Sequence, residues 1–144
     1  MLVEVRDEID VELVRLLIRK YHGQGIPPGG GAGRGHRYFV WLVESYVCAV
    51  AWLHDSTPFR FIAEKFRIPT DNSYFIRRIC KTCPGDHLVA FLNALADKLA
   101  SEGKEVLWTL GLPNHSNILY KLANFQLIGY TTRTKHPVYV RKLR

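Results

Sequence analysis

The sequence predicts a single-domain α/β (α+β) fold in which a mixed sheet of about seven strands is flanked by about three helices. Two observations lead to this prediction. Short segments rich in β-branched and aromatic residues alternate along the chain with apolar stripes of helical spacing. The chain has 144 residues, of which 47% are hydrophobic and 23% charged, as in one ordinary globular domain. We therefore expect 1–144 to form one domain with its own core.

The first elements are a strand and a helix. Leu2 to Arg6 alternates between apolar and polar residues, which indicates a short strand. Asp10 is expected to cap an amphipathic helix that Gly23 ends. Its apolar stripe consists of Leu13, Val14, Leu17, Ile18 and Tyr21. The segment 23–36 is expected to be a flexible loop, because seven glycines and two prolines precede position 36 in it.

Three further strands follow the loop. Tyr38–Val43 and Tyr46–Leu53 are separated only by Glu44 and Ser45, so they predict a hairpin. Ser73–Cys80 has the same β-rich composition and predicts a third strand. The segment between them, 59–68, alternates imperfectly and matches neither pattern.

The C-terminal half begins with the strongest periodic signal. Apolar residues at Leu88, Leu92, Leu95 and Leu99 predict a helix, with Asp86 as its cap and Gly103 at its end. The remaining segments predict a buried strand, a short helix and a final antiparallel pair, at Glu105–Leu110, Ser116–Leu122, and Phe125–Thr132 with Val138–Leu143. Lys135, His136 and Pro137 join the last two strands.

The charge balance favours an anionic partner. Twenty Lys and Arg against thirteen Asp and Glu give a net charge of +7, and the tail 131–144 contains no acid. Such a field attracts nucleic acid, an anionic membrane surface or a phosphate-bearing cofactor, although a cationic surface can also serve only solubility. The longest apolar run, Tyr38–Val43, is far shorter than the roughly 20 residues of a membrane span. The acidic N-terminus does not resemble a secretory leader, so we expect a cytoplasmic protein without a membrane partner.

The segment from Asn114 to Tyr130 carries a resemblance. It reads NHSNILYKLANFQLIGY. This segment and the order of predicted elements resemble the GNAT superfamily of acyl-CoA-dependent N-acyltransferases. The resemblance implies a mostly antiparallel sheet and transfer of an acyl group, most simply acetyl, from coenzyme A to an amine by direct attack. Asn124 stands where the family most often has Gly, and Asn also adopts the left-handed conformation that ends a helix.

The resemblance also implies where the cofactor binds. In the family, a glycine-rich turn and the following helix N-terminus hold the pyrophosphate of coenzyme A. The implied cofactor-binding residues are Ile79, Cys80, Lys81, Thr82, Gly85, His87 and Asn117. This chain has only Gly85 in the turn, followed by Asp86. A degenerate, non-catalytic member that binds no coenzyme A is therefore an alternative.

Acyl transfer needs a base for the amine and an acid for the leaving thiolate. The resemblance implies Tyr120 as the acid, and the alternative is a tyrosine that only packs in the core. Glu44, His22, His36 and His115 are the available bases. The histidines His22 and His36 lie on either side of the glycine loop, where the family places its acceptor.

A second resemblance is to the Mom-type DNA modification proteins of phages, which share the fold. Tyr21-His22-Gly23 and the segment 120–125 are similar to theirs. Residues expected to contact nucleic acid or another substrate are Arg34, Arg37, Arg133 and Lys135. Cys80 and Cys83 have the spacing of two ligands of a four-ligand zinc site. The chain offers no convincing set of further ligands, so we expect no metal. A monomer and a dimer both remain open.

Overall fold

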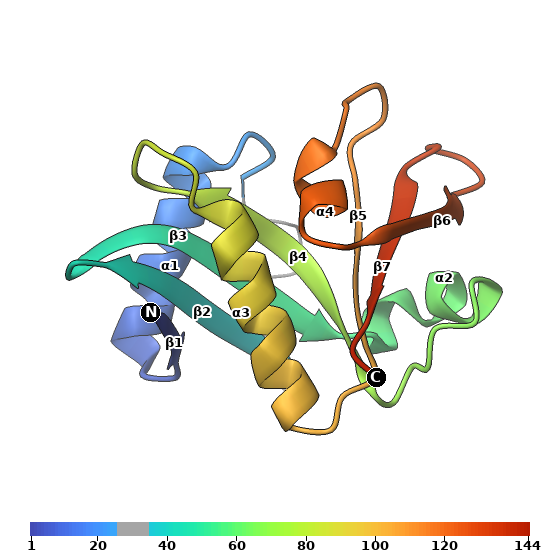
Figure 1. Ribbon diagram of the computed structural model, residues 1–144, viewed down its shortest axis with the longest axis horizontal. Helices are drawn as coiled ribbons and strands as arrows, with labels where there is room; N and C mark the ends of the chain where they lie inside the picture. The colour runs from blue at the N-terminus through green and yellow to red at the C-terminus, as the bar shows by residue number, and fades with distance from the viewer. Residues whose placement is uncertain (26–34) are drawn as a thin grey trace.

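The computed structural model describes residues 1–25 and 35–144. In these residues one mixed sheet has the strand order β1-β2-β3-β4-β5-β7-β6 (Figure 1). The strands are β1 (Leu2–Val5), β2 (His36–Val43), β3 (Tyr46–Asp55), β4 (Ser73–Lys81), β5 (Val106–Leu110), β6 (Gln126–Tyr130) and β7 (Pro137–Lys142). Neighbouring strands are antiparallel except β4 and β5, which are parallel. The predicted mixed, mostly antiparallel sheet is confirmed.

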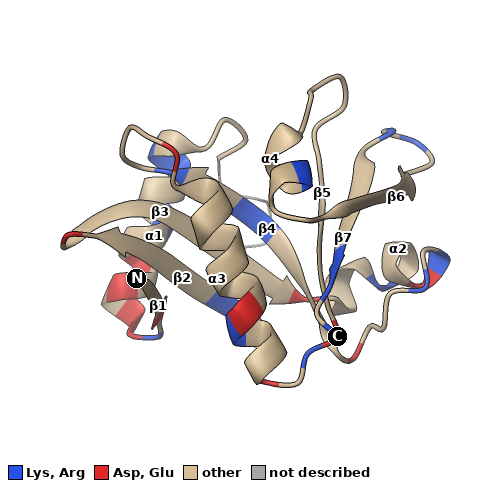
Figure 2. Cartoon of the chain, in the orientation of Figure 1, with Lys and Arg blue, Asp and Glu red and all other residues tan. Residues whose placement is uncertain are grey.

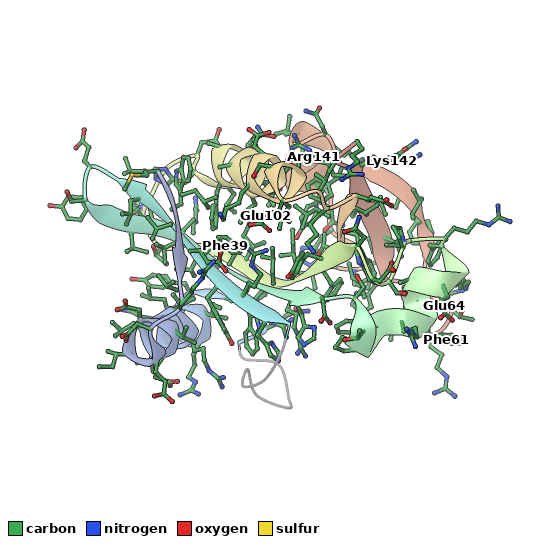
Figure 3. The ribbon with its side chains drawn as sticks, turned by 90° about the horizontal axis from the view of Figure 1, so that it is seen from below. Phe39, Phe61, Glu64, Glu102, Arg141 and Lys142 are labelled. Atoms are coloured by element: carbon green, nitrogen blue, oxygen red, sulfur yellow. The ribbon has the colours of Figure 1, made fainter. Side chains whose placement is uncertain are left out.

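Helices cover both faces of the sheet. They are α1 (Glu8–Tyr21), α2 (Arg60–Lys65), α3 (Leu88–Ser101) and α4 (Ile118–Leu122), with a 3₁₀ turn at Thr57–Phe59. Figure 3 shows α3 on one side of the sheet and α1 on the other. The predicted stripe of α3 is buried against one face, with Leu92, Leu95 and Leu99 fully covered. Val14 and Ile18 of α1 pack on the opposite face against Trp52 of β3.

Two predicted helix caps are wrong. Helix α1 is capped by Asp7, whose Oδ1 accepts a hydrogen bond from the Ile9 N–H at 2.9 Å, so Asp10 lies inside the first turn. The N-cap position of α3 is occupied by His87, with no side-chain hydrogen bond to the helix, so Asp86 does not cap it. The first N–H groups of α3 therefore have no side-chain acceptor among the described residues.

The hairpin and the segment 59–68 have clear local causes. Glu44 and Ser45 both have positive φ angles, 52° and 81°, which is the two-residue turn that matches strand twist. The segment 59–68 contains α2, a six-residue helix. Its Phe61 is 82% exposed, so an apolar residue faces solvent and no amphipathic pattern is visible in the sequence. None of the described helices is long and apolar enough to cross a membrane.

Candidate active-site cleft

The two parallel strands β4 and β5 separate after a short paired stretch. Only Ser73–Phe75 of β4 pairs with Val106–Trp108 of β5, although β4 continues to Lys81. Beyond Phe75, alternate backbone N–H and C=O groups of β4 therefore face away from β3 without a strand partner in the described chain. Figure 1 shows the two strands diverging below α4.

A cleft of about 680 Å³ occupies this opening. Its walls come from β4, the end of β5, the following loop, α4, the end of α1 and the β6–β7 turn. An adjoining hollow of about 530 Å³ reaches Lys81 and Leu88. The two share His22, Gln24, Ile79 and Leu112 as lining residues, so they form one groove along β4. The groove runs from the start of α3 to the ring of Tyr120.

A bulge in β4 determines what the cleft contains. Trp52 pairs with Arg78 and Leu53 pairs with Ile76, so Arg77 has no partner in β3. Ile76 and Ile79, three residues apart, both belong to the core on the α3 side. Regular alternation forbids this, so the bulge brings the side chains of Arg77 and Arg78 together on the α1 side.

The two arginines are half-buried and lie among rings and carbonyl groups. The Arg77 guanidinium lies 5.4 Å from the centre of the Trp52 ring and 5.6 Å from that of Phe59. Arg78 donates to the carbonyl oxygens of Gly25, at 2.9 Å, and Arg77, at 2.7 Å. Burial lowers the pKa of both guanidiniums, and Arg77 further lowers that of Arg78. Sequence reasoning missed both because no spacing signal marks a bulge.

His22, one of the predicted bases, lines the cleft. It follows α1 in an extended conformation, and its Nδ1 accepts the N–H of Gln24 at 3.0 Å. The proton of the neutral ring is therefore on Nε2, and the lone pair that a base needs is already used. Burial, then the charge of Arg78, lowers the pKa of His22. The geometry suits a hydrogen-bond donor better than a base.

Tyr120 of α4 also lines the cleft. Its ring stacks on Tyr139 with centroids 5.2 Å apart and meets Phe125 edge-on at 5.6 Å. Burial raises the pKa of Tyr120, and a side-chain hydrogen bond with Thr109 partly opposes the rise. The phenol is thus protonated at neutral pH and fixed in place, as an acid requires.

His136 of the β6–β7 turn also lines the cleft and is a candidate base that sequence reasoning missed. Its Nδ1 lies 2.9 Å from the carbonyl oxygen of Gly111. A carbonyl can only accept, so the neutral ring carries its proton on Nδ1 and leaves the Nε2 lone pair available. The described residues provide no hydrogen-bond partner for Nε2. The only feature of the sequence that could have marked His136 is its position directly before Pro137 in a predicted turn.

Asn117 helps to build the wall beside His136. It has a left-handed backbone, and its amide bonds the N–H and C=O of Leu112 and the C=O of His115 at 3.0 to 3.2 Å. A Cβ on Gly111 would lie 2.8 Å from its Oδ1. Asn117, which was predicted to bind cofactor, thus lines the cleft, but its side-chain amide bonds the loop from Leu112 to His115.

Some residues of the predicted cofactor turn line the groove, and others form hydrogen bonds that support the turn. Ile79, Cys80 and Lys81 line the groove. Thr82 instead donates to the Val47 carbonyl at 2.5 Å, and His87 Nε2 lies 2.8 Å from the Pro84 carbonyl oxygen. Lys81 donates to the carbonyl of Gly85, which has a φ of 113°. These bonds shape the turn before the uncapped start of α3.

Of the remaining predicted residues, His115 lines the cleft, whereas three others lie outside it. Glu44 is exposed at the tip of the β2–β3 hairpin. His36 lies on the α1 side, accepting the Trp52 Nε1–H at 3.0 Å. Arg37 is held by Glu4 and Glu102. The structure therefore does not bring these three residues to the cleft.

The predicted nucleic-acid residues and the cysteines complete the comparison. Arg133 and Lys135 are exposed on the turn that carries His136, and Arg34 lies outside the described residues. Figure 2 shows basic colouring on β4, α4 and this turn, with no acid on β4 or α4. The three cysteines are free thiols. No group of three or more His, Cys, Asp or Glu in the described part of the chain is arranged to hold a metal.

Comparison with known proteins supplies one sequence relative and several structural ones. Uncharacterized protein 154 of Sulfolobus islandicus rod-shaped virus 1 is 60% identical, over 97% of this chain and 94% of that protein. No family model matches the chain. An aminoglycoside acetyltransferase in complex with coenzyme A superposes with a TM-score of 0.71 at 13% identity, covering 99% and 95% of the two chains. A GNAT-family protein from Desulfovibrio desulfuricans gives 0.69 at 14% identity over 100% of both. These likenesses show the GNAT fold.

Proposed function

This chain belongs to the family of uncharacterized protein 154 of Sulfolobus islandicus rod-shaped virus 1, and we propose that it is an acyl-CoA-dependent N-acyltransferase, most simply an acetyltransferase. The observation that carries the proposal is the continuous groove along the unpaired side of β4. It leads from the uncapped start of α3 to Tyr120. An elongated ligand with an anionic end and a reactive far end fits this shape and polarity.

The residues present fit coenzyme A. The free N–H groups at the start of the 14-residue helix α3 suit a pyrophosphate, and the Lys81 ammonium lies 3.3 Å from the carbonyl oxygen of Gly85 in the turn that precedes this helix. Ile79 provides an apolar wall, and the open backbone of β4 offers hydrogen bonds to the amides of a pantetheine arm. Bound acyl-CoA supplies a thioester carbonyl that is activated toward an amine. A structural neighbour holds coenzyme A in the same fold, which supports this assignment.

Three groups of this chain would then perform the transfer. His136 Nε2 takes the proton from the acceptor amine, because its Nδ1–H is fixed on Gly111. An N–H of the unpaired β4 backbone stabilises the negative charge that develops on the carbonyl oxygen. The Tyr120 hydroxyl gives its proton to the departing sulfur, and burial keeps that proton on the phenol until then.

Thermal unfolding with acetyl-CoA tests the proposal. A ligand at about 100 times its Kd adds roughly 2.7 kcal/mol of stability, so the melting temperature should rise clearly. Lys81→Glu should reduce this rise, whereas Lys142→Glu, an exposed charge reversal on β7, should not. Absence of any rise at millimolar acetyl-CoA would support the degenerate, non-catalytic alternative.

A second candidate is a Mom-like protein that modifies or binds nucleic acid on the same fold. Arg133 and Lys135 favour it, because they are exposed on the turn that carries His136. Duplex DNA should then bind with an affinity that falls steeply with salt, and Arg133→Gln with Lys135→Gln should reduce the salt slope by about 2. DNA binding that is absent at low salt would remove this candidate.

A further inference from the structure

We infer that the acceptor is an amine whose molecule also carries a carboxylate or a phosphate, with Arg77 binding that anionic group. The inference rests on the proposed function and specifies its substrate class. Arg77 lines the cleft and is half-buried, yet no carboxylate is paired with it in the described residues. The segment 26–34, outside that description, contains no Asp or Glu.

The fold fixes Arg77 rather than leaving it free to reach solvent. The β4 bulge sets its direction, and the rings of Trp52 and Phe59 lie on its guanidinium. No hydrogen-bond acceptor for its side chain is present in the described chain. A partly desolvated cation without a counter-ion is costly, so a ligand that provides the missing anion binds with a favourable gain.

The groups around Arg77 add positive charge, and few acids lie near enough to offset it. Arg78 is adjacent, and both of its hydrogen-bond acceptors in the described chain are neutral carbonyl groups. The other titratable groups on this side are His22, His36, His54, Arg15 and Tyr38, with Glu12 and Asp55 as the acids. Neither acid lines the cleft. Glu12 lies 3.8 Å from Arg15, and Asp55 hydrogen-bonds Thr57 and lies 3.0 Å from His54.

The lining of the cleft therefore selects against simple cationic amines. Two arginines and three histidines face it, without one carboxylate among the described lining residues. A protonated amine or a polyamine is repelled there, whereas an attached anion offsets the repulsion and anchors the molecule. The same positive field lowers the pKa of a bound amine, which makes the proton easier for His136 to remove.

Matched amine pairs test the inference at saturating acetyl-CoA, with released thiol as the readout. The pairs are glycine with glycinamide, and O-phosphoethanolamine with ethanolamine. The anionic member should have a kcat/KM higher by about tenfold or more, as one charge-assisted hydrogen bond provides. Glycinamide and ethanolamine, which lack the anion, have the more acidic ammonium groups and therefore more free amine at a given pH. This difference favours the members without the anion, so it works against the expected result. The pair with the larger ratio of kcat/KM between its two members shows whether the anion is a carboxylate or a phosphate.

Variants assign the preference to Arg77. Arg77→Gln should abolish it and Arg77→Lys should restore part of it, while the acetyl-CoA melting shift stays unchanged. Arg19→Gln removes one exposed charge from α1 and should retain the full preference. Equal rates for both members of each pair in the unmodified protein, with acetyl-CoA bound, would overturn the inference and leave the proposed function intact.

A measurement without acetyl-CoA separates the two proposals. Inorganic phosphate should shift the NMR signals of the His22 ring and raise its apparent pKa, because an anion bound by Arg77 also offsets the charge of the neighbouring Arg78, which lowers the pKa of His22. The shift should be lost in Arg77→Gln. If acetyl-CoA never binds but phosphate gives this response, the proposed transfer fails and only the anion site stands. If phosphate leaves His22 unchanged, the anion site itself is refuted.

Discussion

Arg37 of β2 donates hydrogen bonds to both carboxylate oxygens of Glu102, at 2.7 and 2.8 Å. It also holds both oxygens of Glu4 in β1 at 2.8 Å. Its guanidinium lies over the ring of Tyr74, 5.1 Å from the centroid. One arginine thus joins the edge strand, the second strand and the end of α3, on the face where Figure 3 labels Glu102.

Replacing this arginine should destabilise the fold. Arg37→Met leaves the half-buried carboxylate of Glu4 and the exposed carboxylate of Glu102 without their cation, and we expect a loss of about 2 kcal/mol at pH 7. The hydrogen bond from Arg37 lowers the pKa of Glu4 and of Glu102 in the folded state. Their contribution is therefore present above pH 4.5, the unfolded value, and is lost as the pH falls below it.

Urea unfolding at pH 7 and pH 3 measures this difference. The gap between the original protein and Arg37→Met should shrink at pH 3. Arg60→Met, which breaks an exposed 3.7 Å pair with Glu64 on α2, should cost less than about 0.5 kcal/mol at either pH. An equal gap at both pH values would mean that packing of the arginine stem, not its charge, supplies the stability.

The ion pairs of Arg37 also illustrate what the sequence does not predict. This arginine follows a glycine-rich segment in a basic protein, which favours an exposed contact with substrate. Its partners lie 33 and 65 residues away, and no local pattern connects them. Which carboxylate meets which cation depends on strand order and on the exact end of α3, so charge composition alone does not reveal it.

Gly111 should tolerate no side chain. In Gly111→Ala the added Cβ would meet Asn117 Oδ1 at 2.8 Å and Pro137 Cγ at 2.9 Å, so the loop must move. We expect a loss of about 1 to 3 kcal/mol and weaker binding in the cleft. Gly23→Ala, which meets nothing within 4 Å, is the matched control. Equal melting temperatures for the two variants would show that the loop has room for a side chain at Gly111.

His36 should make stability depend on pH. Burial, followed by the charges of His54 and Arg77, lowers the pKa of His36 from 6.5 to about 4. The unfolded chain then binds more protons between these values, so stability is complete above pH 6.5 and declines as the pH falls toward 4. Allowing for solvent screening, the decline is about 1 to 2 kcal/mol.

Chemical unfolding from pH 7 to pH 4.5 checks this decline. His36→Gln keeps an acceptor for Trp52 and should have a flatter pH profile. Ser116→Ala, an exposed substitution in the cleft that changes no titratable group, should leave the profile unchanged. A decline of the same size in all three proteins would assign it to other groups.

Tyr120→Phe should lower kcat by about 100-fold, the lower end of what one acid contributes, while the affinity for acetyl-CoA changes little. The ring and its stacking on Tyr139 are retained and the hydrogen bond with Thr109 is lost, so stability should fall by about 1 kcal/mol. Tyr130→Phe removes an exposed hydroxyl and serves as the control. A normal kcat in Tyr120→Phe would leave this residue with a packing role only.

The sequence predicted elements much better than it predicted the site. Periodic stripes such as that of α3 report burial directly, so the seven strands and the longer helices follow from local pattern. The cleft depends instead on where β4 and β5 separate and on one extra residue at Arg77. Neither feature leaves a periodic trace. Tyr120 was found only through resemblance, and His22 only because it is next to a loop.

His136 is the strongest test of the proposed chemistry, because its role follows from hydrogen-bond geometry alone. Asn can donate to the Gly111 carbonyl in place of Nδ1–H but has no equivalent of the Nε2 lone pair. We therefore expect His136→Asn to fold with normal stability. Its kcat/KM should fall by about 100-fold or more, and its affinity for acetyl-CoA should be unchanged.

A matched histidine variant distinguishes a base from a residue that only lies near the reaction. In His136→Asn, which keeps the bond to Gly111, kcat/KM should fall while the melting shift with acetyl-CoA is kept. His22→Asn should retain most of kcat/KM, because the Nδ1 of His22 is already bonded to Gln24. If His22→Asn loses the activity and His136→Asn retains it, the base is His22, and the bond to Gln24 must open during the reaction.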